Sequence, residues 1–559
     1  MNFKSAHPEL TLSDFERRFG DRHLLHGVVA KWAHEKPDAV ALIDADRGKN
    51  TTWAEFDRNS TALALYLLRM GFKKGDRFAS LLPLTGEHLF LEYACFKIGA
   101  IFVPLDLRLT AGEILRSLKL VGAVGFAFVK VPGIPDLEGF LLESKDELSL
   151  RTVIQFAASS ECSPSATAIR SVMQDAMAAC TDTALVERLK NGSVDENDGA
   201  LVIFTTGSTG SPKPALLSHR NISCQAMCIS QSLLRGGGML RTLVNLPPSH
   251  VGCQTELLMG TLFEGGTAVL LPIFEPAKSM QAIQDCRVTA IGQIPAMFQF
   301  EWRLKNYGAY DLSSLEFAAY GGQQVSAGFI DTMAKMAPHV GTGLGLTETA
   351  GFCTYIRRGT GAARDCATTL GTAMPVYPMS IRAAMRLDGS AGEELPAGAI
   401  GHVCFRGPQT FLGYINDPVA TAAVISTDRY LYTGDMGSLH PDGLHMAGRA
   451  KLVIKSGGYQ VFPGDIENHF STLEPVASCA VVGVEHPIIS EAIVAFVEKK
   501  PGAELTLQML ERHARGLASY MRPRNYVLLA SGEMPLNRVA KPDYLILRER
   551  AKAISETKG

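Results

Sequence analysis

The segment TTGSTGSPKP, residues 205–214, combines small hydroxyl residues, glycines and one lysine directly after the apolar run ALVIF at residues 200–204. Such residues cannot fill a hydrophobic core. Glycine lets backbone N–H groups approach an anion closely, short hydroxyls add donors, and Lys213 adds a positive charge. We therefore expect a phosphate-binding loop, with a surface loop that binds nothing as the alternative.

Two common nucleotide-binding motifs do not describe this chain. The Walker pattern needs a Gly-Lys-Ser/Thr step, which the segment at 205–214 lacks. The segment GTGLGL at residues 341–346 departs from the GxGxxG spacing of dinucleotide-binding proteins. The sequence thus argues against an ordinary P-loop enzyme and against a dinucleotide-binding protein.

Further segments with chemical side chains follow the loop in a fixed order. They are LPPSHVG, YGGQQVS, GLGLTETAG, YLYTGD, GRAKLVIKSGGYQVFPGDIE and PLNRVAK. Together with FTTGSTGSPKP they resemble the successive motifs of the adenylate-forming superfamily, from about residue 30 to residue 545, and most of all its acyl-CoA synthetase branch. The resemblance implies that a carboxylate attacks the α-phosphate of ATP and releases pyrophosphate. A thiol, usually that of coenzyme A, then displaces AMP.

The resemblance assigns four catalytic residues. Lys541 matches the family's catalytic lysine, which bridges carboxylate and phosphate oxygens. Thr347 matches the α-phosphate contact and Glu348 the Mg²⁺ ligand, a role that suits a carboxylate because hard dications prefer oxygen donors. His250 matches a gate residue near the carboxylate pocket. Taken singly, these residues are typical of a solvated surface charge, a helix start and a structural histidine.

The resemblance also assigns residues to ATP and to coenzyme A. The residues matching the β- and γ-phosphate cradle are Thr205, Thr206, Gly207, Ser208, Thr209, Gly210 and Lys213. Those matching the adenine wall are Gly321, Gly322, Gln323, Leu344 and Gly345, where Leu344 replaces the usual aromatic residue. Those matching the ribose contacts and the hinge are Asp435, Arg449 and Lys451, and those matching the pantetheine tunnel are Gly457, Gly458 and Tyr459.

The predicted acid pocket favours an apolar substrate. Its segments, at residues 250–254, 294–297, 320–322 and 344–352, are mostly small and apolar. We expect an aromatic, alicyclic or medium-chain monocarboxylic acid. NLPPSHVGCQTELLMG lacks the Asp that peptide-synthetase domains use for an amino group, and Glu256 is out of register. The alternatives are adenylation with a non-CoA acceptor (a carrier protein or an amino-acid-type reaction), a luciferase-like oxidase, and a binding protein without activity.

Alternating helices and strands must position these motifs. Apolar runs such as DAVALID, GDRFASLLP, TAIGQIP and LEFAAYGG alternate with helical patterns, which predicts an α/β fold with parallel sheets whose strand ends bind ligands. The resemblance adds two αβ sheets and a small β-barrel-like subdomain in a large domain at 1–448. Near Gly448 the sequence pattern changes to short strands, a charged turn and a helix. This change predicts a hinge at 449–451 and a small, mobile α+β domain at 452–559.

Composition limits the partners. The 559 residues carry a formal net charge of -2, which gives no argument for nucleic acid or an anionic membrane. No run is apolar enough for a membrane helix, and the first residues are mixed in charge. Eleven cysteines without CxxC spacing predict reduced thiols and a cytoplasmic protein. The expected partners are the acid, ATP and coenzyme A, and the oligomeric state is open, with a homodimer as one alternative.

Overall fold

The structure is a computed structural model that describes residues 10–130, 137, 139, 147–205, 212–235, 239–357, 362–536 and 542–556. The chain divides into two compact units. The first comprises Met1–Met379, Phe405–Leu431 and Asp442–Leu444, and the second comprises Ser380–Cys404, Tyr432–Pro441 and His445–Gly559. Among the described residues, no helix has the length and apolarity needed to cross a membrane.

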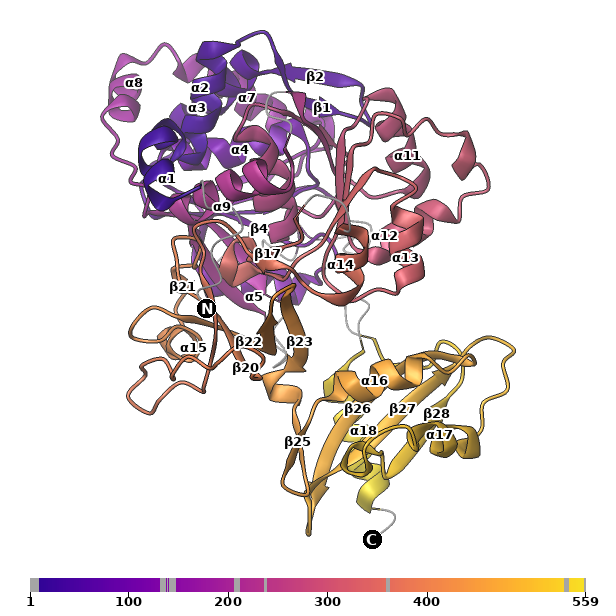
Figure 1. Cartoon of the computed structure of the whole chain (residues 1–559). Coiled ribbons are helices and arrows are strands. Elements are labelled where there is room, and N and C mark those ends of the chain that lie inside the picture. Colours follow the sequence, from indigo (N-terminus) through magenta and orange to yellow (C-terminus); the bar gives the residue numbers. More distant parts are fainter. Residues whose placement is uncertain are drawn as a thin grey trace. The chain divides into compact units, whose positions relative to one another are not determined.

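An eight-stranded sheet forms one half of the first unit (Figure 1). Its central strands are parallel, and two antiparallel pairings at one edge add β9 and β21. In order across the sheet the strands are β21 (Gly413–Tyr414), β9 (Lys213–Ser218), β8 (Gly199–Thr205), β4 (Ile101–Pro104), β3 (Arg77–Leu81), β5 (Ala123–Phe128), β6 (Thr152–Gln155) and β7 (Thr167–Ala168). The predicted strand GDRFASLLP is therefore β3.

A seven-stranded sheet forms the other half, and all its pairings are parallel except that of β1 with β2. Its strands are β14 (His339–Gly341), β13 (Phe317–Tyr320), β12 (Ala290–Gln293), β10 (Arg241–Val244), β11 (Thr267–Leu270), β1 (Val40–Asp44) and β2 (Lys49–Thr52). The two parallel sheets confirm the predicted α/β class.

The helices of the first unit follow the apolar periodicity and the caps of the sequence. Thr52 caps α3 (Trp53–Arg69) in a capping box with Glu55, and Gly71 follows its end with a positive φ of 82°. The other long helices are α2 (Leu25–Glu35), α4 (Gly86–Lys97), α5 (Ala111–Val121), α7 (Ile169–Ala179), α9 (His219–Ser232), α11 (Pro276–Asp285) and α12 (Pro295–Trp302). The remaining helices are α1 (Leu12–Arg18), α8 (Thr183–Lys190), α10 (Met259–Leu262), α13 (Ala327–Met333), α14 (Ala362–Thr368) and α15 (Pro418–Ala422).

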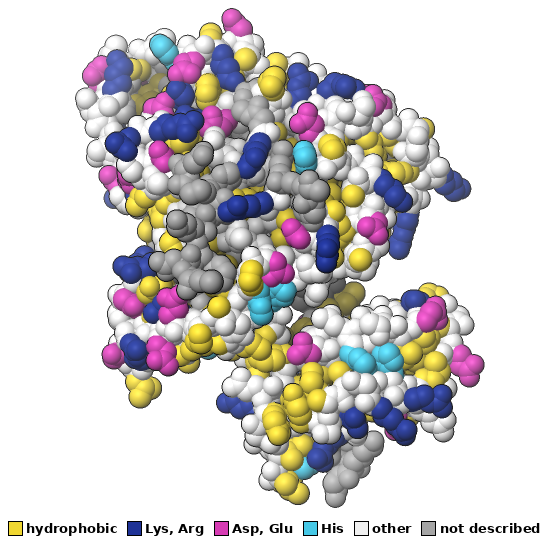
Figure 2. All heavy atoms as spheres, in the orientation of Figure 1, with side chains coloured by type: hydrophobic (Ala, Val, Ile, Leu, Met, Phe, Trp, Pro, Cys, Tyr) yellow, Lys and Arg dark blue, Asp and Glu magenta, His cyan; other side chains and the backbone are white. Residues whose placement is uncertain are grey.

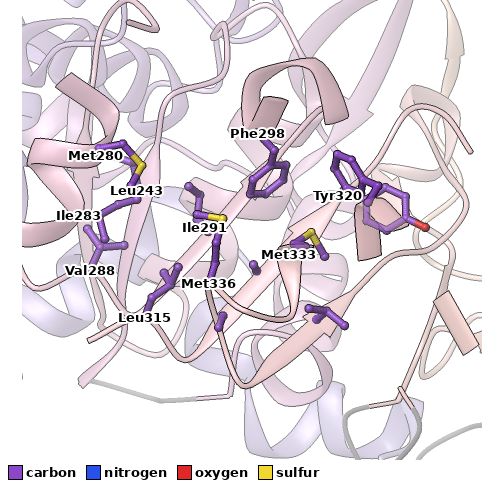
Figure 3. Packing of buried hydrophobic residues seen from close by; sticks show 14 of the residues in the cluster. Leu243, Met280, Ile283, Val288, Ile291, Phe298, Leu315, Tyr320, Met333 and Met336 are labelled. Atoms are coloured by element: carbon purple, nitrogen blue, oxygen red, sulfur yellow. The ribbon is translucent and has the colours of Figure 1, made fainter. Parts of the chain in front are cut away.

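Helices α11, α12 and α13 cover one face of the seven-stranded sheet. Leu243 and Ile291 of the strands pack with Met280 of α11, Phe298 of α12 and Met333 of α13 (Figure 3). All of these side chains are buried, so the sheet and its helices form one hydrophobic core. On the visible surface of this unit, basic and acidic side chains are interspersed rather than segregated by sign (Figure 2).

The second unit contains two sheets. A four-stranded sheet, which shares a few end residues with the first unit, has the order β19 (Met379–Arg382), β20 (Gly401–Phe405), β22 (Leu431–His440) and β23 (Gly443–Arg449). A five-stranded sheet contains β24 (Ile454–Ser456), β25 (Tyr459–Val461), β26 (Val476–His486), β27 (Ser490–Lys499) and β28 (Asn525–Leu529). Helices α16 (Pro463–Ser471) and α17 (Leu507–Ala514) pack in one hydrophobic cluster of this sheet, and α18 (Tyr544–Glu556) packs in the other. The five-stranded sheet and these three helices form an α+β arrangement, the class expected for the C-terminal part of the chain.

A buried carboxyl group connects α11, α12 and β12 in the first unit. Ser279 Oγ and Gln293 Nε2 donate hydrogen bonds to Glu301 Oε1, at 2.5 Å and 2.8 Å. Burial raises the pKa of Glu301 to about 7, although both hydrogen bonds lower it. The group is fully buried, so its neutral form is favoured in the folded protein up to about that pH.

We predict that Glu301→Gln removes a pH-dependent loss of stability. The pKa is higher in the folded than in the unfolded state, so stability falls as pH rises from about 4.5 to 7. Over this range we expect wild type to lose on the order of 3 kcal/mol of unfolding free energy relative to the variant. Denaturant unfolding at several pH values measures the difference. A constant difference across this range would contradict the prediction.

Candidate active site

The two ends of the predicted phosphate loop lie side by side. Thr205 ends β8 and Lys213 begins β9, and the two residues are partners in the antiparallel register. Strand β8 runs parallel to β4, which places Thr205 at a strand end of the kind that binds ligands in α/β sheets. Lys213 is thus held by a strand, where the sequence analysis expected a loop. The predicted cradle residues Thr206, Gly207, Ser208, Thr209 and Gly210 lie outside the described residues.

Tyr414 connects Lys213 with the predicted metal ligand Glu348. Tyr414 Oη donates a hydrogen bond of 2.5 Å to Glu348 Oε1, and Lys213 Nζ lies 5.2 Å from the centre of the Tyr414 ring. Strand β21 carries Tyr414 and pairs with β9, which brings the tyrosine beside the lysine. Burial raises the pKa of Tyr414, and Glu348 raises it further, so the hydroxyl stays protonated and acts as a donor.

A tight hairpin presents Thr347 and Glu348. Strands β15 (Gly345–Leu346) and β16 (Gly351–Phe352) pair antiparallel, and the 3₁₀ turn Thr347–Thr349 lies at the tip. The approach to the hairpin requires Gly343, because a Cβ there would lie 2.0 Å from the carbonyl oxygen of Thr354. The backbone of the hairpin thereby fixes the position of the Glu348 Cα atom, from which the carboxylate side chain extends.

The predicted adenine-wall residues adjoin this hairpin. Gly321 and Gly322 follow strand β13, and the backbone N–H of Gly321 donates to the Gln293 carbonyl oxygen. A Cβ on Gly321 would lie 3.4 Å from the ring of Phe352, which follows Gly351 in the hairpin. Gly322, Gln323 and Gly345 are exposed, and Leu344 is half-buried. Of these residues, the structure places Gly321 against the hairpin, in which Gly345 itself lies.

The helix after His250 carries a carboxyl group that the sequence analysis did not assign to the pocket. His250 is exposed, and its Nδ1 accepts a 3.0 Å hydrogen bond from the Gly252 N–H. The π-helix Gly252–Leu258 follows, and Glu256 on it lies against Gly351, where a Cβ would be 2.7 Å from Glu256 Cγ. Burial raises the pKa of Glu256 to about 7, and the backbone N–H of Phe352 lowers it. The sequence signal was a carboxylate four residues after Gly252 in an apolar run.

In the second unit, Asp435 and Arg449 form an ion pair. Arg449 Nε lies 2.9 Å from Asp435 Oδ1, and the carboxylate is almost fully buried. The two residues come from the neighbouring strands β22 and β23. The Asp435 backbone N–H donates to Thr433 Oγ1 of the same strand. The structure thus brings together the two predicted ribose contacts.

The other predicted residues of the second unit that the structure describes lie before β24, between β24 and β25, and at the start of β25. Lys451 lies exposed in the 3₁₀ turn Ala450–Leu452, and its carbonyl oxygen accepts from Arg548. Gly457 and Gly458 form the exposed turn between β24 and β25, with positive φ values of 57° and 85°. Tyr459 stacks on the ring of Tyr520, with 4.3 Å between the ring centres. Lys541 lies outside the described residues.

Comparisons with known proteins identify the same family along most of the chain. The family model for AMP-binding enzymes matches residues 29–415, and that for the AMP-binding enzyme C-terminal domain matches residues 465–541. Feruloyl-CoA synthase of Amycolatopsis sp. is 29% identical over 88% of this chain and 92% of its own. Indoleacetate–CoA ligase of Aromatoleum aromaticum is 30% identical over 84% of this chain and 88% of its own.

Solved structures give the same architecture. The amide bond synthetase McbA of Marinactinospora thermotolerans has a TM-score of 0.76 at 26% identity, covering 94% of this chain and 99% of its own. ATP-bound MatB of Rhodopseudomonas palustris has a TM-score of 0.78 at 23% identity, covering 95% of this chain and 99% of its own. The second similarity is one of fold alone.

We predict that Gly343→Ala destabilises the first unit. The added methyl group meets the Thr354 backbone, which cannot move without disturbing the hairpin. The expected loss of unfolding free energy is about 1–3 kcal/mol, the usual cost of overpacking. Gly308→Ala is the matched control, because a Cβ at Gly308 meets nothing within 4 Å. Equal thermal unfolding of both variants would contradict the prediction.

Proposed function

The chain belongs to the AMP-binding enzyme family, and from this membership we propose that it is an ATP-dependent acid–CoA ligase. Its relatives are ligases that form CoA thioesters, and the similarity covers most of their length. The observation that carries the proposal is Tyr414, which joins the phosphate-loop lysine to the predicted metal ligand at the ends of β9 and β21. A site that activates a carboxylate needs a lysine and a metal-binding carboxylate near the same polyphosphate.

The first half-reaction forms an acyl-adenylate. An oxygen of the acid's carboxylate attacks the α-phosphorus of ATP, and the bond from that phosphorus to pyrophosphate breaks. Because an anion attacks an anion, catalysis depends on positioned donors and cations. Thr205, Lys213 and the loop between them would hold the leaving pyrophosphate. Thr347 would contact the α-phosphate, and Lys541 would bridge the carboxylate and the phosphate oxygens.

The donor set at Glu348 fits Mg²⁺. Its half-buried carboxylate offers hard oxygen ligands, and the neutral hydroxyl of Tyr414 orients one of them. Glu348, with Thr347 beside it, would hold the ion, which would supply charge neutralisation at the phosphates. The role of Tyr414 in this arrangement is to fix the direction of the carboxylate.

The second half-reaction forms the thioester. The thiol of coenzyme A attacks the acyl carbon, and AMP leaves with the bonding electrons. Asp435, held by Arg449, would accept hydrogen bonds from the ribose hydroxyls of the nucleotide. We propose residues 449–451, with Lys451, as the hinge between a domain at 1–448 and one at 452–559. Gly457, Gly458 and Tyr459 would line the path of the pantetheine arm.

The remaining assignments concern the adenine, the acid and the compartment. Gly321, Gly322, Gln323, Leu344 and Gly345 would surround the adenine base. The relatives named for ferulate, indoleacetate and 4-coumarate act on aromatic acids, and this favours an aromatic monocarboxylic acid within the wider class. We place the protein in the cytoplasm because ATP and coenzyme A are both supplied there. His250 would lie at the entrance to the acid pocket.

We predict acid-dependent pyrophosphate release and a CoA thioester product. The purified protein is incubated with ATP, Mg²⁺ and aromatic, alicyclic or straight-chain acids, with and without coenzyme A, and both products are measured. Lys541→Ala should lose both activities by at least about a hundredfold. Lys500→Ala, a surface lysine of the same unit, is the control. Pyrophosphate without thioester would indicate another acceptor, and neither product with any acid would contradict the proposal.

We predict that Tyr414→Phe weakens Mg²⁺ use. The variant keeps the ring beside Lys213 but loses the hydroxyl that orients Glu348. The expected rise in the half-saturating Mg²⁺ concentration is roughly 10–100-fold, the usual effect of removing such a partner. Calorimetry of ATP binding at fixed Mg²⁺ gives a readout independent of turnover. Tyr310→Phe, which loses only a surface hydrogen bond to Asn306, is the control. Unchanged Mg²⁺ dependence would remove Tyr414 from this role.

A further inference from the structure

The carboxyl group of Glu256 occupies space that three glycines leave open. A Cβ on Gly351 would lie 2.8 Å from Glu256 Oε1, and one on Gly345 would lie 3.4 Å from the same atom. A Cβ on Gly252 would lie 3.3 Å from Glu256 Oε2. The two carboxyl oxygens therefore lie among bare backbone at the base of the hairpin that carries Thr347 and Glu348. No side chain of these three residues shields the carboxyl group.

The protein meets only part of the hydrogen-bonding capacity of this group. The backbone N–H of Phe352 donates to it, and no lysine or arginine among the described residues contributes to the shift of its pKa. An ionised carboxylate has about four acceptor positions on its two oxygens, so one N–H leaves most of them for another molecule. Burial without a cation makes the charged form costly, and a ligand donor would offset that cost.

The neighbouring polar residues of the same helix have other partners. Gln254 Nε2 donates to the buried Glu92 at 3.2 Å, and Thr255 Oγ1 donates to the Ala350 carbonyl oxygen at 2.6 Å. These contacts anchor the π-helix to the core and to the hairpin, so the position of Glu256 is fixed by its neighbours. Glu256 itself is half-buried and lies beside the exposed Gly345. It therefore keeps access from the side on which the acid is proposed to bind.

We propose that Glu256 selects acids that carry an uncharged hydrogen-bond donor, such as a phenolic hydroxyl or a ring N–H, on the part that lies against Gly345 and Gly351. The inference rests on the proposed ligase function and deepens it. An uncharged donor loses less hydration on entering this space than an ammonium group does, and it still satisfies the carboxylate. An acid without a donor would exclude water from the half-buried carboxyl group without replacing its hydrogen bonds, which is a strong basis for rejection.

The test compares matched acids on wild type and two variants. The probes are cinnamic acid and its 3-hydroxy, 4-hydroxy, 4-methoxy and 4-aminomethyl derivatives, with kcat/KM measured from pyrophosphate release. We expect wild type to prefer a hydroxylated acid to cinnamic acid by at least about tenfold. Glu256→Leu should abolish this preference, so that the ratio of kcat/KM for the hydroxylated acid to that for cinnamic acid falls to about one. Glu256→Gln, which retains an acceptor oxygen, should keep part of it. Glu275→Gln, at an exposed position, is the control.

The outcomes separate the inference from the function on which it rests. An unchanged ratio of hydroxylated to plain acid in Glu256→Leu would overturn the role of Glu256 and leave the ligase function intact. A preference for the aminomethyl acid that disappears in Glu256→Leu would overturn the choice of an uncharged donor. No pyrophosphate from wild type with any acid, including straight-chain acids, would overturn the ligase function itself. Circular dichroism melting curves identify a variant whose ratio changes because it is misfolded.

Discussion

The candidate site depends on one close approach of backbone to backbone. At Gly343 the chain passes the Thr354 carbonyl so closely that no side chain fits, and this contact lets residues 341–356 double back as a hairpin. Thr347 and Glu348 lie at its tip, and Gly345 and Gly351 lie at its base. Thr347, Glu348 and two of the glycines that lie against Glu256 are therefore positioned by the same short segment.

The partly or fully buried carboxyl groups of this protein have different kinds of polar partner. Glu348 accepts a hydrogen bond from the Tyr414 hydroxyl, and Asp435 is paired with Arg449. Glu301 is held by two neutral donors, and Glu256 by one backbone N–H. Both groups without a cation have a pKa raised to about 7 by burial. The carboxylates assigned to metal and ribose thus have a fixed partner, whereas Glu256 retains capacity for a ligand.

The π-helix at Gly252–Leu258 gives the acid side its specific geometry. Gln254 contacts the buried Glu92 and Glu256 faces the hairpin, because residues two positions apart on a helix lie on different faces. The wider helical turn changes which residues share a face relative to an α-helix, and such turns often occur at functional sites. A carboxylate and its anchor can thereby be held by one turn of chain.

Local sequence determined the elements of this protein, and the family resemblance of its motifs supplied the proposed residue assignments. Apolar patterning and glycines are local signals, which is why β3, β12 and β13 lie where the sequence predicts them. The order of the motifs likewise indicated Thr347, Glu348, Asp435 and Arg449. Only the tertiary structure decided that Tyr414 lies between Lys213 and Glu348, because β21 must first pair with β9. It also decided that Glu256 faces the hairpin, since that contact depends on a helix type and on glycines about a hundred residues further along the chain.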